Sequence, residues 1–282
     1  MKLAIQAVIQ DLMDRVMTRV LKEDPFLPES HKARKPLYTA LVPDEIFKGS
    51  HFERRFVTRF GHVWEQLAIV AAEKGLGHGV KGYEISGTIK EGRLRRISEI
   101  LNQLEHSVNG KKKRKPNWDF ELAYILQGVG QEIPIKVVCD IYAQNNLTGE
   151  RFAFELKGPL PNSDQTKVSK EKILKLYAMT DPQIEGAYYA LPYNPYGTKR
   201  EDYEWSFPGR WFDMKRDEAV LIGNEFWEKV GGVGTYQAFI DAVNEIAPEY
   251  KERIYREFLC IEPPDGFDAR LEYETLFLIV TP

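Results

Sequence analysis

The chain has 282 residues, of which 43% are hydrophobic and 29% are charged. This balance is typical of a folded globular protein and excludes a wholly disordered chain. The formal net charge of −3 excludes a generally basic nucleic-acid binder, so any such binding must come from local patches. The two cysteines, Cys139 and Cys260, are too few for a disulfide framework. The N-terminus lacks the apolar run of a signal peptide and no run is long enough to span a membrane, so we expect a cytoplasmic protein.

The first hundred residues are expected to be mainly helical. Apolar residues at helical spacing predict an amphipathic helix over residues 2–22. Prolines from residue 25 to residue 50 indicate an irregular connection. A second helix is expected at about 52–74, a short strand at 83–89 and a third helix at about 92–106. Within the second helix, Glu65 is either a solvated carboxylate or an auxiliary ligand that leans into a catalytic cleft.

A run of cations, GKKKRKP, follows at residues 110–116. It is either a solvated loop or a surface that contacts phosphates and makes binding salt-dependent. Because the run directly precedes a predicted sheet, its cations are candidate nucleic-acid contacts: Lys112, Lys113, Arg114 and Lys115.

From residue 117 the pattern becomes strand-like. WDFELAYIL, KVVCDIYA and RFAFELK predict three consecutive antiparallel strands. A helix over about residues 165–179 and a strand at 186–193 follow, and this crossover predicts that the fourth strand is parallel to the third. The result is an αβββαβ core with a mixed central sheet flanked by helices, an α/β fold. We expect one domain over residues 1–282, with a catalytic core at about 52–195 and helical additions at 1–50 and 196–282.

The hairpin between residues 136 and 157 carries the best candidates for chemistry. Side chains alternate along a strand, so Glu155 and Lys157 share one face. If the hairpin folds about residues 145–150, Asp140 faces Glu155 across the ladder. Two carboxylates could then hold one Mg²⁺, which activates water for phosphodiester hydrolysis. Lys157 would orient or deprotonate that water and stabilise the developing negative charge.

Two alternatives remain open for this motif. Glu155 and Lys157 could form only a surface ion pair, which contributes little, and acid-x-Lys triplets also occur at residues 213–215 and 249–251. The first carboxylate could instead be Asp119, which begins a predicted strand, although we favour Asp140.

Asp140 followed by Glu155-Leu-Lys157 in an αβββαβ frame resembles the PD-(D/E)xK superfamily of restriction-endonuclease-like nucleases, with Cys139 where that motif has proline. The stretches FELKGPLPNSDQTKVSKEKILKL, YNPYG, IGNEFWEKVGG and GTYQAF resemble TdeIII-like Type II restriction endonucleases over about residues 50–245. The resemblance implies Mg²⁺-dependent cleavage of double-stranded DNA at a short sequence, beside a cognate DNA methyltransferase. It also implies metal ligation by Asp140 and Glu155 and a catalytic role for Lys157.

The resemblance further suggests DNA contacts on either side of the crossover helix. A palindromic target would be met by a homodimer with two-fold symmetry. Two sets of residues could contact DNA, although the first also suits the initial turn of a helix and the second suits a turn with packed tyrosines. They are Gln165, Lys167, Ser169 and Lys170, then Tyr193, Asn194 and Lys199.

Two rival functions are compatible with the same residues. A repair or structure-specific nuclease would keep the fold and the chemistry but cut at branches, ends or lesions. A non-catalytic DNA-binding module would make the Glu-x-Lys triplet incidental.

Overall fold

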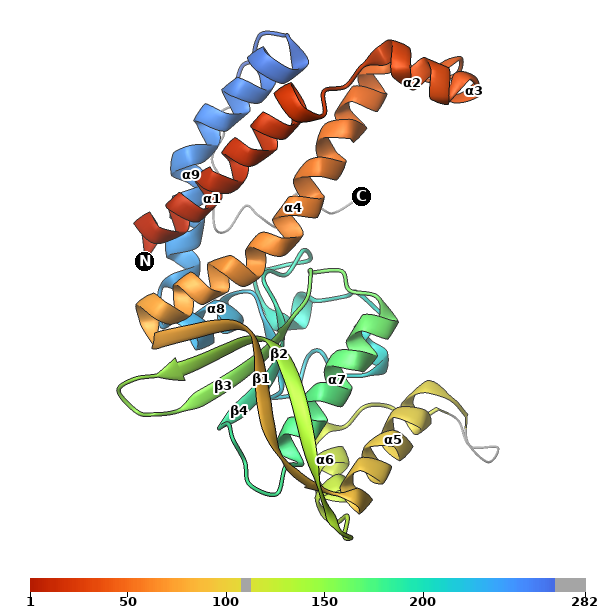
Figure 1. Cartoon of the computed structure of the whole chain (residues 1–282), viewed down its shortest axis with the longest axis vertical. Coiled ribbons are helices and arrows are strands. Elements are labelled where there is room, and N and C mark those ends of the chain that lie inside the picture. Colours follow the sequence, from red (N-terminus) through yellow and green to blue (C-terminus); the bar gives the residue numbers. More distant parts are fainter. Residues whose placement is uncertain (108–112, 267–282) are drawn as a thin grey trace. The chain divides into compact units, whose positions relative to one another are not determined.

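The computed structural model describes residues 1–107 and 113–266, and Figure 1 shows the arrangement of their helices and strands within each part of the chain. The chain divides into two compact units. The first consists of residues 1–67 and the described residues from 237 onward, and the second consists of the described residues between 68 and 236. The single nuclease domain expected from the sequence stays a prediction.

The first unit is helical. Helix α1 (Lys2–Thr18) continues into a π-helical turn (Arg19–Glu23), and helices α2 (Pro28–Arg34), α3 (Pro36–Thr39) and the first part of α4 (Asp44–Gly75) follow. Most of α9 (Thr235–Arg253) and a second π-helical turn (Ile254–Leu259) complete it. Tyr250 ties α9 to α1, because its hydroxyl donates to Asp14 Oδ1 at 2.9 Å.

The irregular connection expected over residues 25–50 is wrong in part, because α2, α3 and the start of α4 lie there. Pro28 and Pro36 stand at the first positions of α2 and α3. Proline is well tolerated at that position, since the missing N–H would have no partner within the helix. The prolines therefore begin helices here instead of interrupting them.

The second unit is built on a five-stranded mixed sheet in the order β1-β2-β3-β4-β5. The strands are β1 (Gly77–Lys90), β2 (Glu132–Asn145), β3 (Arg151–Leu156), β4 (Gly186–Leu191) and β5 (Val220–Ile222). The first three form an antiparallel meander, and β4 and β5 add in parallel. The predicted mixed sheet is confirmed, including the parallel fourth strand.

Residues 118–126 form a helix, α6 (Trp118–Leu126), and the predicted strand there is wrong. Trp118, Glu121 and Ile125 are its buried residues, and this spacing of three and four is helical. Asn117 caps the helix, since its Oδ1 accepts the Phe120 N–H at 2.9 Å. The first strand of the αβββαβ core is therefore β1, which the sequence predicted only as a short strand.

Helices cover both faces of this sheet (Figure 1). Helix α7 (Ser163–Tyr177) contacts β2 and β4, and α5 (Glu91–Glu105) packs against α7 and α6. On the other face, Phe226 of α8 (Asn224–Gly231) packs on Phe154 with ring centroids 5.8 Å apart. The addition expected to be helical after residue 196 therefore also contains a strand, β5, directly before α8. None of the described helices combines the length and apolar character needed to cross a membrane.

Candidate active site

The β2–β3 hairpin brings the two predicted carboxylates to one place. The register pairs Ile141 with Phe154 and Tyr142 with Ala153, so its continuation sets Asp140 opposite Glu155. Directly opposed residues of an antiparallel pair project from the same face. Asp140 Oδ2 also accepts the Leu156 N–H at 2.9 Å, which fixes this carboxylate against the end of β3.

Lys157 lies between these carboxylates. Its Nζ is 2.5 Å from Asp140 Oδ2 and 3.6 Å from Glu155 Oε2. The backbone N–H of Lys157 donates to the Ala190 carbonyl at 3.0 Å, so the residue is held by β4 directly after β3 ends. The side chains of Asp140 and Lys157 are about one-fifth exposed, at 20% and 21%, and can therefore be reached from solvent.

Glu155 is much less accessible, because α7 covers it. Its side chain is 2% exposed, and two residues of α7 contact it. Lys172 Nζ lies 2.8 Å from Oε1 and Ser169 Oγ donates to Oε2 at 3.4 Å. Burial, followed by the Asp140 charge, raises the pKa of Glu155, and the cations of Lys157 and Lys172 act in the opposite direction.

Lys172 is the residue of this cluster that the sequence prediction missed. Ser169 and Lys172 stand three positions apart in α7, so they lie on the same side of the helix. That spacing was a usable signal, but it did not reveal which side of α7 faces the sheet. Lys170, which was selected instead, points elsewhere.

The residues present fit a hard divalent cation. The described residues contain no group of three or more His, Cys, Asp or Glu side chains arranged for a metal. Mg²⁺ requires less, because it is commonly bound through one or two carboxylates and keeps several waters. Asp140 and Glu155 both approach the Lys157 ammonium, which shows that this space already suits a cation.

The alternative acidic residues lie elsewhere. Asp119 is exposed in the first turn of helix α6, so it does not begin a strand as the sequence predicted. Glu65 is half-buried in the part of α4 that belongs to the first unit, and its role as an auxiliary ligand stays a prediction. Cys139, next to Asp140, is a free buried cysteine whose thiol pKa is raised by burial to about 12.

The basic run is only partly described, and Lys112 lies outside the described residues. Lys113 and Lys115 are exposed. Arg114 is held locally, because its guanidinium lies 3.7 Å from the centre of the Phe120 ring and its Nη1 donates to Gln103 at 3.3 Å. Lys113 and Lys115 therefore remain the better placed candidates for phosphate contacts.

The candidates on α7 differ strongly in accessibility. Gln165 is exposed in the first turn, where Asn162 Oδ1 accepts its N–H at 2.8 Å. Lys167 forms an ion pair with Glu105. The prediction that Lys170 contacts DNA must be corrected. Its side chain is 0% exposed, and its ammonium lies 2.5 Å from Glu121 Oε2. A fully buried ammonium cannot contact a DNA phosphate, so Lys170 links α7 to α6.

The loop after β4 also divides into accessible and occupied side chains. Asn194 is buried, with its Nδ2 donating to the Lys199 carbonyl at 2.7 Å and its Oδ1 accepting the Tyr196 N–H at 3.0 Å. This amide stabilises the turn, and the prediction that Asn194 contacts DNA must be corrected. Tyr193 is half-buried, and Lys199 is exposed. These two stay candidates.

Comparison with known proteins identifies the family. The chain matches the family model described as Type II restriction endonuclease, HinfI, over residues 1–247. Two relatives from Herpetosiphon aurantiacus are 26% identical. The Type II restriction enzyme HgiEI aligns over 270 residues, 90% of this chain and 94% of the relative. HgiCII aligns over 228 residues, 80% of this chain and 82% of the relative.

These matches confirm the predicted Type II restriction endonuclease. The TdeIII-like and PD-(D/E)xK assignments stay predictions, since the matching family model is a different one. Over most of its length, this chain belongs to the HinfI family of Type II restriction endonucleases.

Proposed function

We propose that this restriction endonuclease hydrolyses phosphodiester bonds of double-stranded DNA at a short recognition sequence, in a Mg²⁺-dependent reaction with direct attack by water. The observation that carries the proposal is the placement of Lys157 Nζ at 2.5 Å from Asp140 and 3.6 Å from Glu155. The names of HgiEI and HgiCII, both Type II restriction enzymes, support a site-specific reaction.

Asp140 and Glu155 would hold the metal. When bound, Mg²⁺ supplies Lewis-acid stabilisation of the phosphate and lowers the pKa of a coordinated water. Hydrolysis also needs a group that orients the attacking water and steadies the negative charge that develops on phosphorus-bound oxygens. We assign that task to Lys157, which is partly exposed beside both carboxylates.

Lys172 and Ser169 would act as positioning residues. Both contact Glu155 from α7, so they hold its carboxylate in one orientation while the buried surroundings exclude bulk water.

A palindromic target would engage two copies of the chain, and a cognate methyltransferase would protect host DNA. The proposed partners are therefore a second copy of the chain and a DNA methyltransferase.

The central test compares Glu155→Ala and Lys157→Ala with the wild-type enzyme in cleavage of plasmid DNA with Mg²⁺. We expect cleavage rates to fall by at least about 100-fold, the usual effect of losing a group that acts on the reacting water. Binding of DNA in Ca²⁺ should persist. Lys215→Ala is the matched control, because Lys215 is the exposed lysine of another acid-x-Lys triplet.

Full activity in either variant would contradict the assignment of Glu155 or Lys157. The same assay separates Asp140 from Asp119. We expect Asp140→Asn to be inactive and Asp119→Asn to be active, and the reverse result would make Asp119 the first carboxylate. Discrete fragments from linear plasmid DNA would separate restriction from structure-specific cleavage.

A further inference from the structure

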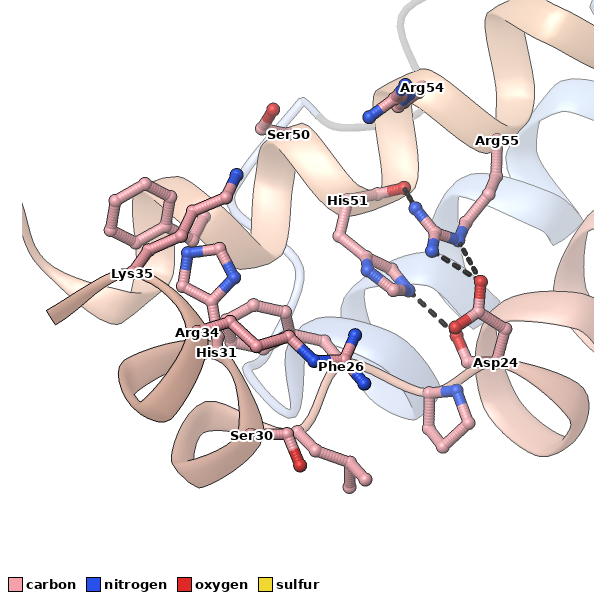
Figure 2. A pocket seen from close by; sticks show the side chains of 13 residues that line it. Asp24, Phe26, Ser30, His31, Arg34, Lys35, Ser50, His51, Arg54 and Arg55 are labelled. Atoms are coloured by element: carbon pink, nitrogen blue, oxygen red, sulfur yellow. Dashed lines mark hydrogen bonds and ion pairs between the residues drawn. The ribbon is translucent and has the colours of Figure 1, made fainter. Parts of the chain in front are cut away.

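The first unit contains a pocket that the proposed catalytic residues do not form (Figure 2). Its volume of about 390 Å³ lies within the range of small-molecule sites, roughly 300–1,000 Å³. The walls come from residues 24–35 and from residues 47–55 of α4. Asp140 and Glu155 belong to the second unit, so the pocket is a separate feature of the chain.

One sequence pattern forms both walls. Ser-His-x-x-Arg, followed by Lys or Arg, occurs at residues 30–35 as SHKARK and again at residues 50–55 as SHFERR. The serine, the histidine, the arginine and the final cation of each copy all line the pocket. Positions i, i+1 and i+4 lie on one side of a helix, and the two copies fall at α2 and in α4. Each copy thus directs a hydroxyl, an imidazole and a guanidinium to the same space.

The second copy supplies Arg55, the cation that neutralises the one carboxylate of the pocket, Asp24. Arg55 Nε donates to Asp24 Oδ2 at 2.9 Å, and this pairing holds the Asp24 pKa below its usual value. The His51 ring completes the contact, with Nε2 at 2.7 Å from the Asp24 carbonyl oxygen. Figure 2 shows these three residues linked by hydrogen bonds at one end of the pocket.

The remaining polar groups are mainly donors without a partner. Arg34, Lys35 and Arg54 are exposed, and within the described part of the chain they make no ion pair or side-chain hydrogen bond. His31 Nε2 is buried and has no hydrogen-bond partner among the described residues. Its ring is held by Phe47, with centroids 4.3 Å apart. A buried polar atom without a partner is unfavourable, and the guanidinium and ammonium groups can only donate hydrogen bonds. The three cations therefore suit the pocket to a ligand that accepts hydrogen bonds and carries negative charge.

We infer that this pocket binds a phosphate group, and that this group is a backbone phosphodiester of the DNA substrate. Guanidinium groups form paired hydrogen bonds with phosphate oxygens, and Arg34 and Arg54 supply one from each wall. Serine hydroxyls are common partners of the DNA backbone, and Ser30 and Ser50 are available on the same walls.

The charge of the whole chain supports DNA as the source of the phosphate. Because the net charge is −3, attraction to DNA must come from clusters such as this one, which sets four cations against one carboxylate. The assignment to DNA rests on the proposed function, whereas the assignment to a phosphate rests on the pocket alone.

The experiment measures binding of a labelled plasmid fragment to the full chain in Ca²⁺ over a range of NaCl concentrations. For the double variant Arg34→Gln/Arg54→Gln we expect at least about tenfold weaker binding and a salt slope smaller by about one, the effect of losing one phosphate contact. The control is Arg15→Gln, since Arg15 is an exposed arginine of the same unit that pairs with Asp11 outside the pocket. It should bind like the wild type.

A second arm identifies the source of the phosphate. Inorganic phosphate and dAMP are titrated into DNA-free protein by calorimetry. Unchanged DNA affinity and salt slope in the double variant overturn the DNA assignment, and dAMP binding that requires both arginines would then identify a free nucleotide as the ligand. If neither probe binds and DNA affinity is also unchanged, the phosphate assignment itself is wrong.

Failure of the proposed function has a different signature. A wild-type protein that neither binds nor cuts the fragment overturns the endonuclease mechanism, while the calorimetric arm still decides the phosphate assignment. Circular dichroism verifies that each variant is folded. If the double variant unfolds, Ser50→Ala is measured in the same way, with the same direction of effect expected.

Discussion

At the scale of single residues, Glu155 is a buried carboxylate that is also a proposed metal ligand. Its carboxylate is 2% exposed and carries contacts from Lys157 and Lys172. A buried carboxylate needs nearby cations, because removal from water disfavours the charged form. The two lysines satisfy that need from different elements, Lys157 from the end of β3 and Lys172 from α7.

We predict that Lys172→Met lowers the cleavage rate by roughly 10- to 100-fold, the usual effect of losing a partner that orients a metal ligand. DNA binding in Ca²⁺ should be unchanged, and Lys172→Arg should restore part of the rate. Lys175→Met is the control, because Lys175 lies one turn further along α7 and pairs with Glu171. Wild-type activity in Lys172→Met would show that Glu155 does not depend on α7 for its position.

At the scale of elements, a buried ion pair joins α6 to α7. Lys170 and Glu121 are both 0% exposed and lie 2.5 Å apart. The Lys170 ammonium also lies 4.7 Å from the centre of the Phe212 ring. Burial lowers the pKa of Lys170, and the Glu121 charge opposes that shift. This pair positions the helix that carries Ser169 and Lys172 onto Glu155.

We predict that Lys170→Met and Glu121→Gln each lower the free energy of unfolding by about 3–5 kcal/mol, since each leaves one charge or polar group buried without its partner. The double variant Lys170→Met/Glu121→Leu should lose much less than the sum of the two. Urea unfolding of the three variants measures this coupling. Strictly additive losses would mean that the pair does not act as a unit.

Asp217 lies close to the same pair, and we predict that it makes the free energy of unfolding depend on pH. Burial raises its pKa from 3.8 to about 6, and Lys170 acts in the opposite direction. Between those pH values the folded chain holds a proton that the unfolded chain has lost. The stabilisation from this proton is complete below about pH 4 and is lost as the pH rises through 6.

Asp217→Asn should therefore become more stable relative to the wild type as the pH rises from 4 to 7, since asparagine keeps an acceptor for the Asp213 N–H. The change in relative stability should be at most about 3 kcal/mol, because one pKa unit corresponds to about 1.4 kcal/mol. Urea unfolding at the two pH values measures it. An identical difference at both values would contradict the raised pKa.

At the scale of the whole molecule, a slightly acidic enzyme must hold a polyanion. The net charge is −3, while Lys113, Lys115, Lys199 and the pocket of the first unit supply accessible cations. These local groups would release counter-ions from DNA on binding.

We predict that log affinity for DNA in Ca²⁺ falls linearly with log NaCl concentration, with a slope of about −0.9 for each phosphate contact. Fluorescence anisotropy over about 50–200 mM salt measures the slope. Lys113→Ala/Lys115→Ala should reduce its magnitude, whereas Lys215→Ala should not. Affinity independent of salt would contradict binding through local cationic groups.

Much of the fold could be predicted because it depends on local periodicity. Alternating side chains predicted β2 and β3, the hairpin loop set their register, and the crossover helix made β4 parallel to β3. The strand prediction for residues 118–126 was wrong because a short apolar segment fits a strand and a buried helix equally well. Its helical state depends on packing against α5 and on the ion pair between Glu121 and Lys170 of α7, and local periodicity specifies neither contact.

The sequence by itself determined which side chains share a strand face, and hence that Asp140, Glu155 and Lys157 converge. It also indicated a Type II restriction endonuclease, because residues along most of the chain carry that resemblance. Only the tertiary structure decided that Lys172 faces Glu155 while Lys170 faces Glu121, and that two copies of one six-residue pattern share a pocket. The physical reason is that periodicity specifies the faces of an element, whereas long-range packing selects the neighbour that each face meets.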